Sequence, residues 1–188
     1  NGSIGLPAAS TEIRLVNDEG MDVGIDEPGE MWVRGPQVMK GYLNRPDATE
    51  EAIEDGWLKT GDIATMDEEG YFRIVDRKKD MIIVSGFNVY PNEIEEVMAM
   101  HKGVLEAAAI GIACEATGEK IRVYIVKSDN GLTQEQVIEH ARENLTKYKV
   151  PKEIVFIDEM PKTNVGKILR KELRELASKE STADKVAA

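Results

Sequence analysis

The sequence of 188 residues predicts an α+β fold in two parts, a β-rich, barrel-like N-terminal part and a small α+β C-terminal part. Nine of the 16 glycines fall within the first 61 residues, where short alternating segments are separated by turn signals. Helical periodicity begins only after about Asp80 and then alternates with further strands. The run Asp76–Asp80, five charged residues in succession, separates the β-rich part from the part with helical periodicity.

The first part, residues 1–76, is expected to hold short strands and one short helix. Asp47–Glu50 has the residue types of a capping box, which predicts a helix that opens at Asp47. The turn Asp67–Gly70 predicts a hairpin. Strands are expected over 11–16, 31–34, 63–66 and 71–75. Many short strands with many glycines favour a barrel or sandwich.

The second part, residues 81–188, is expected to be a compact α+β domain. Asn92 with Glu95, and Thr133 with Gln136, have capping spacing and predict the starts of two helices. A third helix is expected over 167–176, and the small, charged tail after about residue 177 is expected to be mobile. Strands are expected over 81–85, 104–112, 121–127 and 154–157.

The charged run Asp76–Asp80 has two interpretations. Five charged residues in a row are poor candidates for a core, so composition alone favours a solvated turn. The alternative is an interdomain hinge over residues 77–80.

Charge and composition exclude several classes of protein. The net charge of −11 argues against a general nucleic-acid binder, which needs a basic face. The single cysteine excludes an internal disulfide framework and fits a reducing compartment. The two histidines lack the spacing of a metal motif, so no metal site is expected within this sequence.

Three segments contain residues that local secondary structure and packing do not call for, and such departures are typical of functional sites. Asp62 follows Gly61 at the start of a strand, where a carboxylate could accept both hydroxyls of a ribose, although a plain turn residue is the alternative. Gly86 follows an apolar strand and would allow a thin ligand to approach, although a hairpin glycine explains it equally well.

The third segment is Pro161–Arg170. Lys167 is expected in the first turn of a helix, where the helix dipole disfavours a cation unless an anion meets it. Residues 149–174 hold seven Lys and Arg and four acids, which predicts a local anion-binding patch. The alternative is a solvated amphipathic helix.

Together these segments resemble the adenylate-forming superfamily, which includes acyl-CoA synthetases, luciferases and peptide-synthetase adenylation domains. Thr60–Asp62 matches its T-G-D motif, Asp76–Glu96 its hinge and following loop, and Pro161–Lys167 its C-terminal lysine motif. The amino-acid sequences of the hinge and following loop, residues 76–91, and of Tyr148–Pro151 are most similar to those of bacterial long-chain fatty-acid–CoA ligases.

The resemblance implies a two-step reaction in which ATP and a fatty acid give an acyl-adenylate and pyrophosphate, and CoA then displaces AMP. It implies that Lys167 is catalytic and that Lys79 is the hinge about which a mobile C-terminal domain swings. The nucleotide would be bound by Asp62, Ile74 and Arg77. The pantetheine channel of CoA would be lined by Ser85, Gly86 and Phe87.

The family's phosphate loop, Mg²⁺ ligands and acyl pocket belong upstream of this sequence. The chain is therefore expected to be roughly the last third of a synthetase, inactive alone, with the missing N-terminal portion as its partner. Substrates and cofactors would be ATP, CoA and Mg²⁺. The resemblance also suggests a cytoplasmic protein, peripheral association with the inner membrane face and a homodimer.

Two other functions fit part of the pattern. Within the family, the chain could belong to a ligase that loads an acyl carrier protein or activates another carboxylate, or to a luciferase-like oxidase. Outside it, a non-catalytic binding module could hold an acidic partner through residues 149–174.

Overall fold

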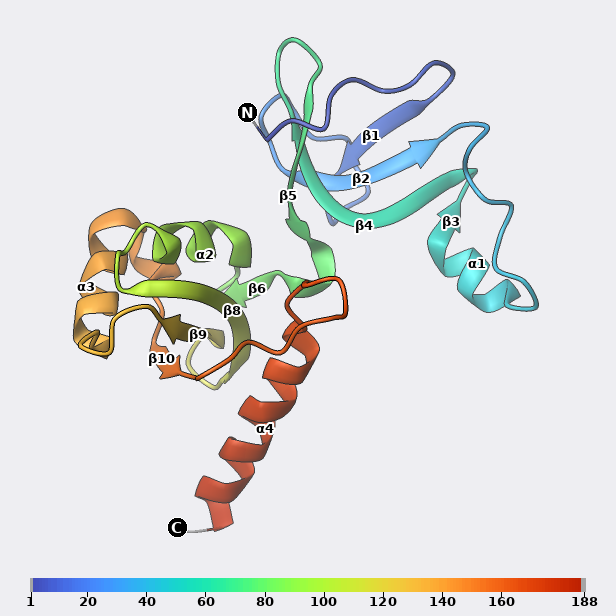
Figure 1. Ribbon diagram of the computed structural model, residues 1–188. Coiled ribbons are helices and arrows are strands. Elements are labelled where there is room, and N and C mark those ends of the chain that lie inside the picture. The colour runs from blue at the N-terminus through green and yellow to red at the C-terminus, as the bar shows by residue number, and fades with distance from the viewer. Residues whose placement is uncertain (1, 187–188) are drawn as a thin grey trace. The chain divides into compact units, whose positions relative to one another are not determined.

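The computed structural model describes residues 2–186, and of the side chains those up to residue 180. The chain divides into two compact units, residues 1–79 and residues 80–188 (Figure 1). The division lies inside the segment 77–80 that the sequence predicts as a hinge. Hinge motion itself stays a prediction.

Unit 1 is an antiparallel sheet with one short helix. Its five strands are ordered β1-β2-β4-β3, with β5 also paired to β4, and Figure 1 shows β4 as a long, strongly curved strand. The elements are β1 (Glu12–Val16), β2 (Gly29–Arg34), α1 (Pro46–Ala52), β3 (Ile53–Glu54), β4 (Trp57–Met66) and β5 (Phe72–Arg77), followed by the 3₁₀ turn η1 (Lys78–Asp80) at the boundary. Leu15, Met31, Ala64 and Phe72 form the core on one face of the sheet.

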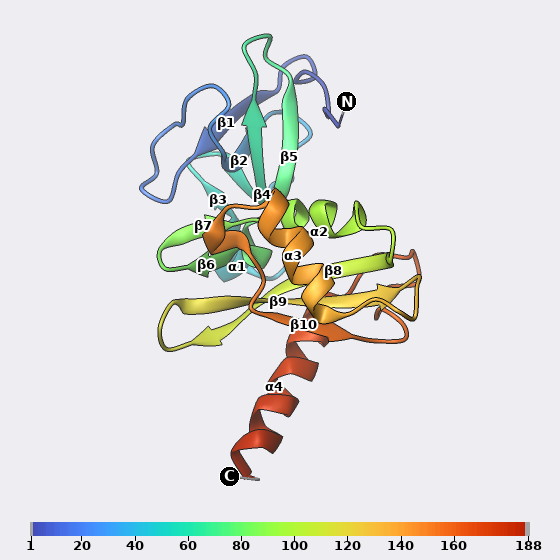
Figure 2. The same cartoon turned by 90° about the vertical axis from the view of Figure 1, so that its left-hand side faces the viewer.

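Unit 2 is a mixed sheet covered by helices on both faces. Its strands are ordered β10-β9-β6-β7, with β8 along β9, and β10 runs parallel to β9. Figure 2 shows β8, β9 and β10 side by side. The elements are β6 (Ile82–Val84), β7 (Phe87–Val89), α2 (Pro91–Ala99), β8 (Val104–Cys114), β9 (Gly118–Lys127), α3 (Gln134–Asn144), η2 (Lys147–Lys149), β10 (Glu153–Phe156) and α4 (Arg170–Val186).

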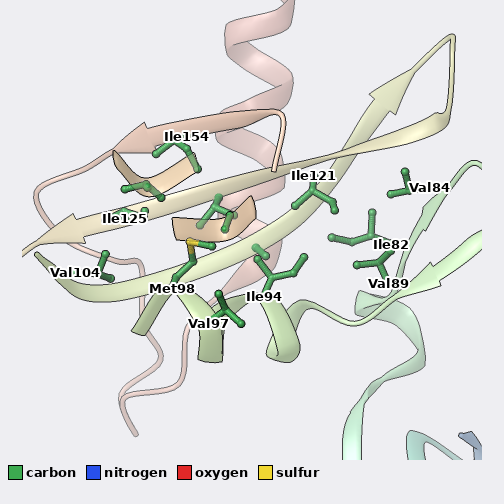
Figure 3. Packing of buried hydrophobic residues seen from close by; sticks show 14 of the residues in the cluster. Ile82, Val84, Val89, Ile94, Val97, Met98, Val104, Ile121, Ile125 and Ile154 are labelled. Carbon is green, nitrogen blue, oxygen red and sulfur yellow. The ribbon is translucent and has the colours of Figure 1, made fainter. Parts of the chain in front are cut away.

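Strand β9 is buried on both faces because its side chains alternate between two cores. Ile121, Val123 and Ile125 pack with α2 and α3, and Figure 3 shows the side chains of Ile94, Val97 and Met98 of α2 pointing toward the sheet. On the other face, Tyr124 packs with Ala108, Ile110, Met160, Leu173 and Ala177, so that α4 covers this side. Helices α2 and α3 therefore cover one face of β9, and α4 covers the other.

The helix starts differ from two of the predictions. Helix α1 begins at Pro46 and α2 at Pro91, and neither has a side-chain cap, so the capping roles predicted for Asp47 and for Asn92 with Glu95 are wrong. Proline at the first helical position starts both helices instead, since its missing N–H would be unsatisfied there anyway. The capping box of Thr133 and Gln136 is confirmed.

We expect Thr133→Ala to lower the free energy of unfolding by about 1 kcal/mol, because the N–H of Gln136 loses its acceptor. Urea denaturation followed by circular dichroism measures the effect. Thr117→Ala is no suitable control, since that hydroxyl also makes a hydrogen bond. The exposed Lys171→Ala is suitable, and a loss for it equal to that of Thr133→Ala would contradict the capping role.

Candidate functional site

The Thr60–Asp62 segment is shaped by the hydroxyl of Thr60. This hydroxyl donates to the carbonyl of Met31 at 2.7 Å and accepts from the N–H of Asp62 at 3.1 Å. Gly61 between them has φ 72°, a conformation that favours glycine. The motif is therefore a rigid bend inside β4, and it fixes the direction of the Asp62 carboxylate.

The three residues predicted to bind the nucleotide lie on one face of the sheet. Asp62 is directly opposite Arg77, and Ala64 is opposite Ile74. The shift of register there leaves Val75 as an extra residue on β5, a β-bulge. Without the bulge, residues three apart on a strand would face opposite sides, so the bulge brings Ile74 and Arg77 together.

Asp62 and Arg77 also bind each other. The Nε of Arg77 lies 3.0 Å from Oδ1 of Asp62, and the Arg77 side chain is 59% exposed. Exposed ion pairs contribute only about 0–1 kcal/mol. Polar groups of a ligand can therefore replace this contact at small cost.

A hollow of about 350 Å³ adjoins this pair and is lined by Thr60, Gly61, Arg77, Lys78 and Lys79. Burial lowers the pKa of Lys78, but hydrogen bonds to Glu30 and Asp18 outweigh burial and hold it above its ordinary value. Lys78 is therefore a cation at neutral pH. A hollow lined by three basic side chains beside a carboxylate suits a phosphorylated sugar.

The charged run is less solvated than its composition indicates. Asp76 is 2% exposed and Asp80 is 8% exposed, whereas Arg77 and Lys79 between them are exposed. The interpretation of this run as a solvated turn, which composition alone favours, is therefore wrong for Asp76 and Asp80. Asp80 is buried because two arginines of α4 approach it, Arg174 at 2.6 Å and Arg170 at 4.0 Å.

Ser85 and Gly86 form the two-residue turn of the β6–β7 hairpin, and β7 was not expected from the sequence. Both have positive φ, 53° and 83°, which is the geometry of a type I′ turn. A side chain at Gly86 would meet no atom within 4 Å, so the turn faces open space. Glycine is needed here for its backbone conformation, as the hairpin alternative supposes.

An aromatic pair beside this turn was missed by the sequence reasoning. Phe87 is 55% exposed, and its ring stacks on Tyr148 with centroids 4.8 Å apart. The two residues are 61 positions apart, and only the fold brings them together. Two exposed stacked rings form a platform on which a planar group can pack.

Lys167 lies in a tight loop before α4, so the prediction that it begins a helix is wrong. The N–H of Thr163 donates to the carbonyl of Lys167 at 2.8 Å, and the N–H of Lys167 donates to the Thr163 hydroxyl at 3.1 Å. A bridge between Lys162 and Ile168 closes the loop. These bonds prevent a helix from starting before Arg170 and present the Lys167 side chain to solvent.

The predicted anion patch is mostly neutralised by acids that the fold brings to it. Five of the seven cations in 149–174 pair with carboxylates. The pairing carboxylates are those of Asp80, Glu93, Glu95 and Glu106, which precede the segment in the sequence, and that of Glu175, which follows it directly. Within the described part of the chain, Lys152 and Lys167 are the two cations of this segment with no carboxylate oxygen within 4.0 Å. The broad patch is thus reduced, and Lys167 stands out.

Among the described side chains, those of residues 2–180, no group of three or more His, Cys, Asp or Glu is arranged to hold a metal ion. The described helices include none that is long and apolar enough to span a membrane.

Comparison with known families gives two matches. The AMP-binding enzyme C-terminal domain matches residues 93–167, and the AMP-binding enzyme family matches residues 1–43. The two matches fall in unit 2 and unit 1 respectively.

Individual relatives agree with these matches. The chain is 62% identical over 184 residues to a long-chain-fatty-acid–CoA ligase of Yersinia pestis, and 45% identical over 175 residues to a 2-succinylbenzoate–CoA ligase of Bacillus mycoides. The match with the first relative covers 98% of this chain and 33% of that relative. The match with the second covers 93% of this chain and 36% of that relative. The chain therefore spans about a third of the relatives that it matches.

A solved structure shares the fold. The o-succinylbenzoate CoA synthetase of Bacillus subtilis, in complex with its acyl-adenylate intermediate, matches with a TM-score of 0.83 and 38% identity. The match covers 92% of this chain and 35% of that one.

Proposed function

The chain belongs to the AMP-binding enzyme family of adenylate-forming proteins, and from that premise we propose that it forms the C-terminal third of a long-chain fatty-acid–CoA ligase. In the first step the fatty-acid carboxylate attacks the α-phosphorus of ATP and releases pyrophosphate. In the second step the thiol of CoA attacks the acyl carbon and releases AMP. The observation that carries the proposal is the exposed ammonium of Lys167, which has no carboxylate oxygen within 4.0 Å among the described residues, in a segment where five of the other six cations are paired.

Unit 1 would bind the nucleoside. Asp62 would accept hydrogen bonds from the ribose hydroxyls, Arg77 would donate to the ribose, and Ile74 would pack against the nucleotide. The shared sheet face and the adjoining basic hollow support these roles. The exposed Asp62–Arg77 pair is weak enough to open when the ligand arrives.

Unit 2 would act in both steps. Lys167 would bridge the substrate carboxylate and the α-phosphate, where negative charge builds up in the transition state. After a rotation about Lys79, the turn Ser85–Gly86 and Phe87 would line the path of the pantetheine arm. The open space at Gly86 and the Phe87–Tyr148 platform support this second role.

Further features rest on the family resemblance alone. They are the Mg²⁺ ion held by upstream residues, peripheral association with the cytoplasmic membrane face and a homodimer. ATP and CoA as substrates follow from the family.

The proposal is tested with the complete gene product, ATP, Mg²⁺, CoA and a panel of carboxylates. We expect AMP release and acyl-CoA formation with fatty acids such as palmitate, and not with 2-succinylbenzoate. Identity of 62% with a long-chain ligase against 45% with a succinylbenzoate ligase supports this preference.

Other results would sustain the alternatives. Thioester formation with 2-succinylbenzoate but with no fatty acid would contradict the substrate class. Transfer to an acyl carrier protein but not to CoA would contradict the acceptor. The absence of any adenylate from every carboxylate would contradict the reaction.

A further inference from the structure

A half-buried ionic cluster joins four elements of unit 2. Arg170, the first residue of α4, donates from Nη2 to both carboxylate oxygens of Glu95 at 2.7 and 2.8 Å and to Oδ1 of Asn92 at 3.2 Å. Its Nη1 lies 4.0 Å from Asp80, and Arg174 lies 2.6 Å from the same carboxylate. Glu95 also accepts from the N–H of Ala109 on β8. The cluster thus connects η1, α2, β8 and α4.

Stability alone is a poor explanation for this cluster. The side chains of Arg170, Glu95 and Asp80 are only 18%, 17% and 10% exposed, and Nε of Arg170 is buried without a hydrogen-bond partner. Burying charges is costly, and apolar residues of similar volume often serve as well. A cation in the first turn of a helix also opposes the helix dipole. Such an arrangement is better explained by the precise placement that it gives to its neighbours.

Its neighbours are the loop of Lys167 and the boundary between the units. Arg170 follows Lys167 by three residues and fixes the end of the loop, where the N–H of Leu169 donates to the carbonyl of Pro161. The start of the loop is fixed by Lys162, which lies 2.5 Å from Glu106 on β8. Asp80 is the first residue of unit 2 and follows Lys79 directly.

We propose that Arg170 is a positioning residue, which sets the place of the Lys167 loop relative to the segment where unit 2 begins. The loop and the hinge would then move as one rigid piece, so that rotation at Lys79 carries Lys167 to a defined position. This inference rests on the proposed function, in which Lys167 serves adenylate formation and not thioester formation.

The first test uses the complete enzyme and measures the two half-reactions separately. We expect Arg170→Met to slow adenylate formation by about 10²-fold, because small misplacements of a catalytic group have effects of this size. The KM for ATP and the rate of thioester formation from supplied acyl-adenylate should stay unchanged. Arg170→Lys keeps the charge but has one nitrogen in place of the two with which Arg170 approaches Glu95 and Asp80, so it should recover part of the lost rate.

Lys171→Met is the matched control. Lys171 is the next residue on the same helix, its side chain is 85% exposed, and its one ion pair is a 3.9 Å contact with Glu175. This variant should keep both half-reactions at the rate of the unmodified enzyme.

The second test needs no activity and uses the 188-residue chain. Hydrogen exchange at the N–H groups of Lys167 and Leu169 should become faster in Arg170→Met than in Lys171→Met, and by a larger factor than exchange at the N–H groups of β9, which reports the loss of stability that follows from removing the ion pair with Glu95. Unchanged exchange in Arg170→Met would overturn the positioning role.

The two proposals fail in different ways. If Lys167→Ala abolishes adenylate formation but Arg170→Met and Arg170→Lys do not slow it, the positioning role is wrong and the function stands. If both half-reactions fall equally in the Arg170 variants, the role is structural and the inference is also wrong. If Lys167→Ala leaves adenylate formation intact while exchange responds to Arg170, the proposed role of Lys167 fails instead.

Discussion

Lys167→Ala in the complete enzyme is expected to slow acyl-adenylate formation by about 10²–10³-fold, while thioester formation from supplied acyl-adenylate continues at its normal rate. The reason is that a preorganised ammonium stabilises charge that appears only in the first transition state. Alanine should leave the loop intact, because its hydrogen bonds use the backbone of Lys167 and the hydroxyl of Thr163. Rapid-quench assays of each half-reaction measure the effect.

The control for this prediction is Lys152→Ala. Lys152 is the other cation of residues 149–174 without a carboxylate within 4.0 Å among the described residues, so the change in net charge is the same. It should leave both steps unchanged. Equal loss of both half-reactions in Lys167→Ala, or equal loss of the first step in the two variants, would refute a specific role for Lys167.

Ile94→Ala should destabilise unit 2 by about 2–5 kcal/mol. Ile94 is 0% exposed and lies in the core between α2 and the sheet (Figure 3), so truncation removes buried apolar surface and leaves a cavity. Urea denaturation of the chain followed by helical circular dichroism reports mainly on unit 2, which contains α2, α3 and α4.

An internal reference makes this measurement specific. Both tryptophans, Trp32 and Trp57, belong to unit 1, so tryptophan fluorescence follows that unit alone. We expect Ile94→Ala to move the dichroism transition and not the fluorescence transition. Ile83→Ala, at a position 48% exposed on β6, should change stability by less than about 1 kcal/mol. A loss that small in Ile94→Ala itself would contradict its place in the core.

Much of the fold could be predicted from local patterns. The alternation in 121–127 and the capping box at Thr133 are short-range signals, and both elements form where they were expected. The starts of α1 and α2 were mistaken because polar residues with capping spacing stood next to a proline that starts each helix. Glu95 was assigned to a cap, whereas the fold uses it to bind Arg170.

The residues of the candidate site could be predicted from sequence motifs, but their arrangement in space could not. Asp62, Ile74 and Arg77 were recognised by family resemblance, but their common face depends on a bulge at Val75 that no local pattern announces. The pairing of the cations in residues 149–174 could also not be predicted from the sequence. The carboxylates that pair with them lie 56 or more residues away along the chain and are those of Asp80, Glu93, Glu95 and Glu106. Long-range pairing is information that a linear pattern does not contain.

The double burial of β9 has a consequence for synthesis on the ribosome. One face of this strand is covered by α2 and α3. The other face is covered by Leu173 and Ala177 of α4, which are synthesised about 50 residues after β9 ends. At a translation rate of about 5–20 residues per second, the apolar face around Tyr124 would stay uncovered for several seconds. Nascent chains that stop before α4 should therefore be ready substrates for chaperones and prone to aggregate.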